Sequence, residues 1–257
     1  MMYNFNRLES FGNNYQISPY IDINHIYCIN LDRSLVRWNR IRQMAIKSNL
    51  NITRFSAVDG YKLDIDSVRQ DGVFVGNTFS KDSKLNNLGA LGCALSHINL
   101  WKKSQYLDGN VLILEDDVII PKNFKQIYSK YITHVPLDWD IIFLGGNRIM
   151  GRKINSHVIA PITSRKIIRR KKINNYNYGF FGYIINSAKI KKIIDICTPL
   201  RFTIDTHLKN LGFPRLKVYY IIPTIIKHDY QLVSTIRNIS RENDSLRNNK
   251  VTIIEDV

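Results

Sequence analysis

Three consecutive carboxylates, Glu115, Asp116 and Asp117, directly follow the apolar run Val111–Leu114. Four apolar residues in a row are typical of a strand that is buried on both faces. Ligands of an open α/β sheet bind beyond the carboxyl ends of its strands. A divalent cation with oxygen ligands would offset the mutual repulsion of the three charges. The segment is therefore a candidate metal and phosphate site, and a solvated acidic turn is the alternative.

Polar residues also follow the first strand pattern, which covers residues 25–31. Asp32 could accept hydrogen bonds from a uracil or a ribose, and Arg33 or Arg37 could bind a phosphate. Apolar residues then recur at helical spacing up to residue 45. A strand, a short polar turn and a helix form the first unit of a nucleotide-binding α/β half. For Arg37, a solvated helix face is the alternative.

Three further positions place an ionisable group at the end of a predicted element. Asp59 follows a second strand pattern, residues 51–58, and precedes a glycine that is free to adopt positive φ. Asp205 opens a short helix, where an acidic residue usually serves as a cap. His228 precedes Asp229 after a late strand. A turn is the alternative interpretation for Asp59, and a helix cap is the alternative for Asp205.

Residues 88–105 have the clearest helical pattern, because apolar side chains recur every three or four positions. Gly89 and Gly92 lower the helix propensity by about 1 kcal/mol each, so we expect close approach to a neighbouring strand or ligand. His97 lies in the middle of this helix. It is a candidate binding residue, and a hydrogen-bonded core histidine is the alternative.

The strand–turn–helix pattern indicates an α/β fold, and the sequence shows neither an internal repeat nor a domain linker, so one domain is the simpler interpretation. We expect a surface arm at residues 1–20, the domain at 21–236 and a polar tail at 237–257. A basic loop or hairpin is expected within the domain at 148–178, where Arg and Lys are concentrated.

Composition limits the partners and the compartment. The 257 residues contain 37 Lys and Arg against 21 Asp and Glu, a net charge of +16, so we expect anionic partners. The scattered cysteines, Cys28, Cys93 and Cys197, lie in apolar surroundings and indicate reduced thiols. The sequence shows neither a signal-peptide pattern nor a run of about 18 apolar residues. We therefore expect a cytoplasmic protein without a membrane span.

Six short motifs occur in series over roughly residues 24–230, and their order and spacing resemble glycosyltransferase family 25. This family contains the lipooligosaccharide galactosyltransferases and the procollagen galactosyltransferases. The motifs are Ile29-Asn30-Leu31-Asp32-Arg33, Ala57-Val58-Asp59-Gly60, Gly89-Ala-Leu-Gly92-Cys-Ala-Leu-Ser96-His97, Leu112-Ile-Leu-Glu115-Asp116-Asp117-Val118, Trp139-Asp140 with Phe143-Leu144-Gly145, and Gly182-Tyr183-Ile184-Ile185.

The resemblance implies a GT-A type fold, a Rossmann-like single domain with a central mostly parallel sheet flanked by helices. It also implies a UDP-sugar donor such as UDP-galactose, a divalent cation, usually Mn²⁺ (or Mg²⁺), and inversion at the anomeric carbon. Carried over by motif, the residues of the donor site are Asp32, Arg33, Asp59, His97, Glu115 and Asp116.

The resemblance also implies roles in the reaction. Asp117 would ligate the metal with Asp116, and His228 would be a further ligand by analogy with related GT-A folds. The cation would stabilise the leaving diphosphate as a Lewis acid. Asp205, on a looser match, would be the base that takes the proton of the acceptor hydroxyl. The acceptor would be a glycan or a hydroxylysine, and the hexose galactose or glucose.

Two other classes of protein are compatible with parts of the sequence. The charge of +16 and the cluster at residues 165–172 suggest a nucleic-acid-binding protein, whose affinity would fall steeply with salt. That class gives no reason for three carboxylates at a strand end. A non-catalytic glycan-binding relative of the same fold is the second alternative.

Overall fold

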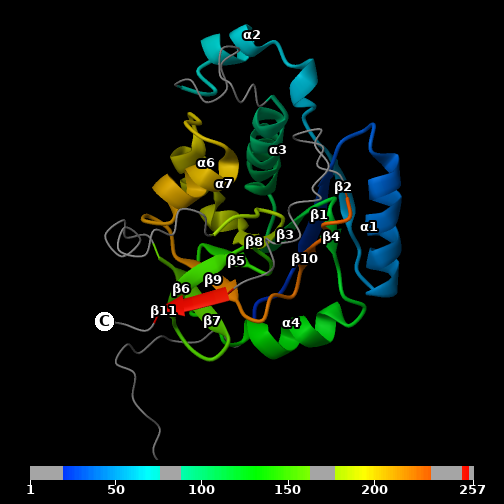
Figure 1. Cartoon of the computed structure of the whole chain (residues 1–257), viewed down its shortest axis with the longest axis vertical. Coiled ribbons are helices and arrows are strands. Elements are labelled where there is room, and N and C mark those ends of the chain that lie inside the picture. Colours follow the sequence, from blue (N-terminus) through cyan, green and yellow to red (C-terminus); the bar gives the residue numbers. More distant parts are fainter. Residues whose placement is uncertain (1–19, 76–87, 163–176, 233–250, 255–257) are drawn as a thin grey trace, which may run out of the picture.

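The computed structural model describes residues 20–75, 88–162, 177–232 and 251–254. A nine-stranded sheet in the order β11-β6-β7-β9-β5-β8-β3-β1-β2 forms its centre (Figure 1). The strands of this sheet are β1 His25–Asn30, β2 Thr53–Ser56, β3 Asn110–Glu115, β5 Ile141–Phe143, β6 Ile149–Lys153, β7 Val158–Pro161, β8 Gly182–Asn186, β9 Val218–Ile221 and β11 Val251–Ile254. A separate antiparallel pair joins β4 Val118–Ile119 to β10 Lys227–His228.

Seven of the nine strands run in one direction, and only β7 and β8 run against them. The prediction of an α/β fold with a mostly parallel sheet is therefore confirmed. Because β1, β2 and β3 are adjacent and parallel, their carboxyl ends meet at one edge. Asp32, Asp59 and the acidic run all follow these ends.

Helices cover both faces of the sheet. The main ones are α1 Leu35–Lys47, α2 Ile65–Gln70, α3 Leu88–Ser104, α4 Phe124–Ile132, α6 Ile190–Cys197 and α7 Ile204–His207, with shorter turns η1 Gly60–Lys62, η2 Ser187–Lys189 and η3 Leu208–Gly212. One apolar core joins the sheet to α3 and α6, and a second joins its opposite face to α1 and α4.

Strand β3 is buried on both faces, as predicted. Val111 and Ile113 belong to the core beneath α3, whereas Leu112 and Leu114 belong to the core beneath α1 and α4. All four side chains have no exposed surface. The charged residues after Leu114 thus directly follow four fully buried strand residues.

Helix α3 lies unusually close to the segment that follows β2. A Cβ atom added to Gly92 would come within 2.5 Å of the backbone nitrogen of Gly60 and 2.6 Å of the carbonyl oxygen of Val58. The predicted close approach is therefore confirmed for Gly92. Gly60 itself is required for this packing, because its own Cβ would lie 1.7 Å from the carbonyl oxygen of Leu88. Space, and not the positive φ suggested by the sequence, is the reason for glycine here.

Several expected segments fall partly outside the described residues. These are the surface arm up to residue 19, residues 163–176 of the basic segment, and the tail apart from 251–254. Within 148–178, β6 and β7 pair as antiparallel neighbours. Residues 251–254 form β11, parallel to β6, because their β-branched side chains suit an edge strand.

Candidate active site

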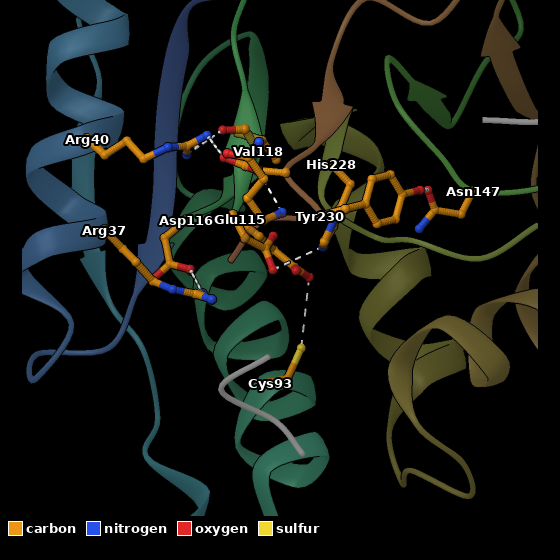
Figure 2. A network of polar contacts seen from close by, with 12 residues as sticks. Arg37, Arg40, Cys93, Glu115, Asp116, Val118, Asn147, His228 and Tyr230 are labelled. Atoms are coloured by element: carbon orange, nitrogen blue, oxygen red, sulfur yellow. Dashed lines mark hydrogen bonds and ion pairs between the residues drawn. The ribbon is translucent and has the colours of Figure 1, made fainter. Parts of the chain in front are cut away.

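The three consecutive carboxylates have three different partners, and Figure 2 shows Asp116 directed toward Arg37. Glu115 lies beside α3, with its Oε1 3.2 Å from Nε2 of His97. Asp116 contacts α1, and Asp117 contacts β10. This divergence explains how the chain tolerates three adjacent negative charges, because each carboxylate has a cationic or proton-donating neighbour of its own.

Asp116 is held inside the protein by two donors. Arg37 Nη1 is 2.5 Å from its Oδ1, and Asn30 Nδ2 donates to its Oδ2 at 2.7 Å. Burial raises the pKa of Asp116, and the Arg37 guanidinium opposes this rise. The sequence placed Asp116 among the metal ligands and donor contacts, but both oxygens are engaged by side chains of the same domain. Its geometry is that of a residue that fixes the turn between Glu115 and Asp117.

Asp117 meets His228, which lies 111 positions later in the chain. Oδ2 of Asp117 is 3.2 Å from Nε2 of His228, and both residues are buried. The pairing of Val118 with His228 in the β4–β10 ladder produces this contact, and the amide of Asp229 donates to the Asp117 carbonyl at 2.7 Å. The structure thus brings together two of the predicted metal ligands.

Arg40, which the sequence did not indicate as a site residue, contacts the residues next to Asp117 and His228. Its Nη1 donates to the Val118 carbonyl at 2.9 Å, and its Nη2 forms an ion pair with Asp229 (Figure 2). An arginine on a half-exposed helix face resembles any solvated cation in sequence. No local pattern could therefore have indicated its role.

His97 is both a core histidine and a neighbour of the acidic run. It has no exposed surface, and its Nδ1 is 2.8 Å from the hydroxyl of Tyr183. Trp101 Nε1 donates to the same hydroxyl at 2.9 Å. Burial raises the pKa of Tyr183 well above its ordinary value, so the hydroxyl stays protonated. The two interpretations that the sequence left open are thus compatible.

The predicted nucleotide contacts lie at the ends of β1 and β2. Arg33 forms an ion pair with Asp59, and Asp59 also caps η1 by accepting from the Tyr61 amide at 3.3 Å. Asp32 accepts from the Ser56 hydroxyl at 2.7 Å and remains 71% exposed. Asp32 and Arg33 are therefore accessible to a ligand at the same sheet edge as Glu115.

Asp205 lies in the first turn of α7, one residue after its start. Its Oδ1 accepts from the Thr203 hydroxyl at 2.8 Å and from the Thr206 amide at 2.7 Å. Burial, and then the charges of Glu115 and Asp205, raise the pKa of the Cys93 thiol. The charge of Asp205 thus acts on Cys93 of α3. Its Oδ2 takes no part in the two hydrogen bonds of Oδ1.

The donor set fits a hard divalent cation at Asp117 and His228. The carboxylate of Asp117 suits Mn²⁺ or Mg²⁺, and Mg²⁺ commonly binds through one or two carboxylates plus substrate phosphates. Both oxygens of Asp116 already accept a hydrogen bond, from Arg37 and from Asn30. The geometry therefore favours Asp117 and His228 as ligands, and ligation by Asp116 stays a prediction.

Comparison with known proteins gives the family. Residues 23–208 match the model of glycosyltransferase family 25 (LPS biosynthesis protein), so the chain belongs to this family. This range contains the acidic run and Asp205, and it ends before His228. Within the described residues, no helix has the length and apolar character needed to cross a membrane.

Relatives of this chain include larger proteins. A "Glycosyltransferase 25 family member" of Aedes aegypti is 29% identical over 67% of this chain and 28% of its own length. Human "Procollagen galactosyltransferase 2" is 25% identical over 66% of this chain and 27% of its own length. A mimivirus "Procollagen lysyl hydroxylase and glycosyltransferase" is 27% identical over 67% of this chain and 20% of its own length. The chain thus spans less than a third of the length of these relatives.

Among solved structures, the apo form of the glycosyltransferase GlyE of Streptococcus pneumoniae TIGR4 aligns with 87% of this chain and 59% of its own, at 11% identity and a TM-score of 0.40.

Proposed function

We propose that this chain is a metal-dependent, inverting glycosyltransferase that moves a hexose, galactose or glucose, from a UDP-sugar to a hydroxyl of a glycan or of hydroxylysine. The main support for this proposal is the contact of Asp117 with His228 at 3.2 Å, because it lies at the carboxyl ends of the strands, where ligands of an open α/β sheet bind. The names of the relatives, several of them procollagen galactosyltransferases, support galactose and hydroxylysine as the first substrates to test.

Asp117 and His228 would hold Mn²⁺ or Mg²⁺, and the donor diphosphate would supply further oxygens. Bound there, the cation would stabilise the charge that develops on the leaving diphosphate. Arg40 keeps the two ligands in register through Val118 and Asp229. The β4–β10 pair would therefore hold Asp117 and His228 next to each other before a donor binds.

Asp32, Arg33 and Asp59 would bind the nucleotide. The exposed carboxylate of Asp32 can accept hydrogen bonds from uracil or ribose, and the half-exposed guanidinium of Arg33 can leave Asp59 for a phosphate oxygen. An exposed ion pair contributes only about 0–1 kcal/mol, so exchanging it for a phosphate is easy.

Turnover of nucleotide sugars tests the proposal. Purified protein is incubated with UDP-galactose or UDP-glucose and Mn²⁺, with and without a hydroxylysine peptide or a glycan, and released UDP is measured. We expect metal-dependent UDP release that Asp117→Asn lowers by at least tenfold. Asp195→Asn is the matched control, because Asp195 is exposed on α6 and pairs only with Lys191 among the described residues. Activity that survives a strong chelator and Asp117→Ala would refute the metal role.

Asp205 is our proposed base for the acceptor hydroxyl. A positioned base typically contributes about 10² to 10⁴-fold, so Asp205→Asn should lower kcat by that factor with an unchanged KM for the donor. The side-chain oxygen of Asn can still accept hydrogen bonds from the Thr203 hydroxyl and the Thr206 amide. We therefore expect α7 to stay folded in this variant. Near-normal transfer by this variant would show that another group takes the proton.

The two alternatives make different predictions. A glycan-binding relative without catalysis would release no UDP under any of these conditions. The nucleic-acid alternative depends on residues 165–172, which lie outside the described residues.

A further inference from the structure

Three side chains with metal-binding atoms meet where α3 touches the end of β3. Cys93 and His97 come from α3, and Glu115 is the last residue of β3. Their ligand atoms all lie within 4.8 Å of one another, with Nε2 of His97 3.2 Å and Sγ of Cys93 4.0 Å from Oε1 of Glu115. Figure 2 shows Cys93 on its helix with the sulfur toward Glu115.

These distances are close to those around a tetrahedral zinc ion. Bond lengths of about 2.3 Å to sulfur and about 2.0–2.1 Å to nitrogen and oxygen place neighbouring ligand atoms about 3.3–3.6 Å apart. The nitrogen–oxygen distance is within about 0.1 Å of this range, the sulfur–oxygen distance exceeds the range by a few tenths of an ångström, and the sulfur–nitrogen distance is at most 4.8 Å. Binding of zinc would therefore draw the Cys93 sulfur toward the other two ligand atoms.

The backbone holds the three residues in place. Cys93 and His97 are four positions apart on one helix, so they share a face. The contact of Gly92 with the backbone of Val58 and Gly60 fixes the helix next to the strand ends. Glu115 ends a strand that pairs with β1 on one side and β8 on the other. The site is therefore built on rigid elements.

His97 has a hydrogen-bond partner on each of its two ring nitrogens. Its Nδ1 contacts the Tyr183 hydroxyl, which is itself fixed by Trp101. Metal-binding histidines usually use their second nitrogen in this way, which fixes the ring. Either a proton or a metal cation must lie between Nε2 and the Glu115 carboxylate, since two lone pairs at 3.2 Å would otherwise repel.

Cys93 differs from the other two cysteines of the chain. Cys28 and Cys197 are fully buried, whereas Cys93 is only partly so. The Glu115 side chain is 23% exposed, so a cation could enter from its side and keep a fourth position open. Thiolate and imidazole select zinc over magnesium or manganese.

We propose that Cys93, His97 and Glu115 form a zinc-binding site with one open position, separate from Asp117 and His228. Such an ion would tie α3 to the end of β3 and would neutralise Glu115 next to the remaining carboxylates. The proposal does not depend on the transferase activity, because its tests measure metal binding directly.

The first test uses Co²⁺ as a spectroscopic probe for zinc. Titration of the chelator-treated, reduced protein should give a cobalt–thiolate charge-transfer band at one ion per chain, and Zn²⁺ should abolish the band. Cys93→Ala should remove the band, whereas the matched control Cys197→Ala, on α6 above the same core, should keep it. Asp117→Asn should also keep it, which separates this site from the proposed Mn²⁺ site. A band that persists in Cys93→Ala would overturn the proposal.

The second test needs no variant. In the native protein, alkylation mapped by mass spectrometry should modify Cys93 before Cys28 and Cys197, and stoichiometric Zn²⁺ should slow the modification of Cys93 at least tenfold. Equal rates with and without Zn²⁺ would mean that the thiol binds no zinc. Slowing by Mn²⁺ to the same degree would contradict the proposed preference for zinc.

Discussion

At the scale of the residue, Asp116 has a structural role, because both of its oxygens accept hydrogen bonds inside the domain. Its neighbours Glu115 and Asp117 belong to the candidate site. Burying a charge stabilises a protein only where the partner compensates its lost hydration. Arg37 and Asn30 provide that compensation for Asp116, and the side chains of the ion pair are only about a tenth exposed. The buried pair therefore sets the direction of the turn that aims Glu115 and Asp117 elsewhere.

We expect Asp116→Ala to lower the free energy of unfolding by about 3–5 kcal/mol, because it leaves the Arg37 guanidinium buried without its carboxylate. The double variant Arg37→Met, Asp116→Leu should lose less than the single variant, since it removes both charges. Denaturant unfolding followed by circular dichroism measures the difference. A single variant as stable as the parent would show that Asp116 is not a structural residue.

At the scale of the element, the glycine contact between α3 and the segment after β2 determines where His97 and Cys93 lie. In a free helix, Gly92→Ala would stabilise the helix by about 1 kcal/mol. Here the new Cβ would meet backbone atoms at 2.5 and 2.6 Å, and backbone cannot move aside cheaply. We expect a net destabilisation of more than 1 kcal/mol in thermal unfolding, with weaker metal binding at Cys93. A stabilised variant would contradict the packing.

His207 couples stability to pH at the junction of α6 and α7. Its Nδ1 accepts from the Arg201 amide at 3.0 Å, and its Nε2 donates to the Ile196 carbonyl at 2.9 Å. Burial lowers the pKa of His207 below its ordinary value, the hydrogen bond to the Ile196 carbonyl opposes this, and the charge of Arg201 lowers the pKa further. The stabilisation is therefore complete above the unfolded pKa of about 6.5 and is lost as the pH falls through the folded pKa.

His207→Gln should flatten this pH dependence. The parent should lose unfolding free energy between pH 7 and pH 5, and the variant should start lower and change less over the same range. His25→Gln is a suitable control, because His25 lies at the amino end of β1 and contacts only the Asp108 carbonyl among the described residues. The same slope in parent and variant would exclude His207 as the source.

Local patterns predicted the elements of the fold well, because a buried strand such as β3 and a striped helix such as α3 are encoded by neighbouring residues. The same patterns placed Asp32, Asp59 and Glu115 at one edge. Sequence could not predict that Asp116 faces Arg37, since three adjacent carboxylates look alike until the turn is known. Asp117 and His228 were joined only by analogy, because 111 residues separate them.

At the scale of the whole molecule, the candidate site is assembled from segments that only the completed sheet brings together. Strand β8 lies between β5 and β3 and runs against both, and it contributes Tyr183 behind His97. His228, a proposed ligand, follows β9 in the chain and pairs with Val118 of β4. Folding of the entire domain must therefore precede donor binding, so a bound donor should stabilise all of it.

This coupling gives a prediction for the intact protein. UDP with Mn²⁺ at about 100 times its Kd should add about 2.7 kcal/mol to the free energy of unfolding. For a domain of this size, 1 kcal/mol raises the Tm by about 2–4 °C, so we expect a rise of about 5–11 °C. Asp117→Asn should lose most of this rise, and Mn²⁺ alone should give little of it. An oligonucleotide could instead raise the Tm, with a rise that vanishes on adding salt. In that case the net charge of +16 would indicate nucleic-acid binding, and the proposed donor site would be wrong.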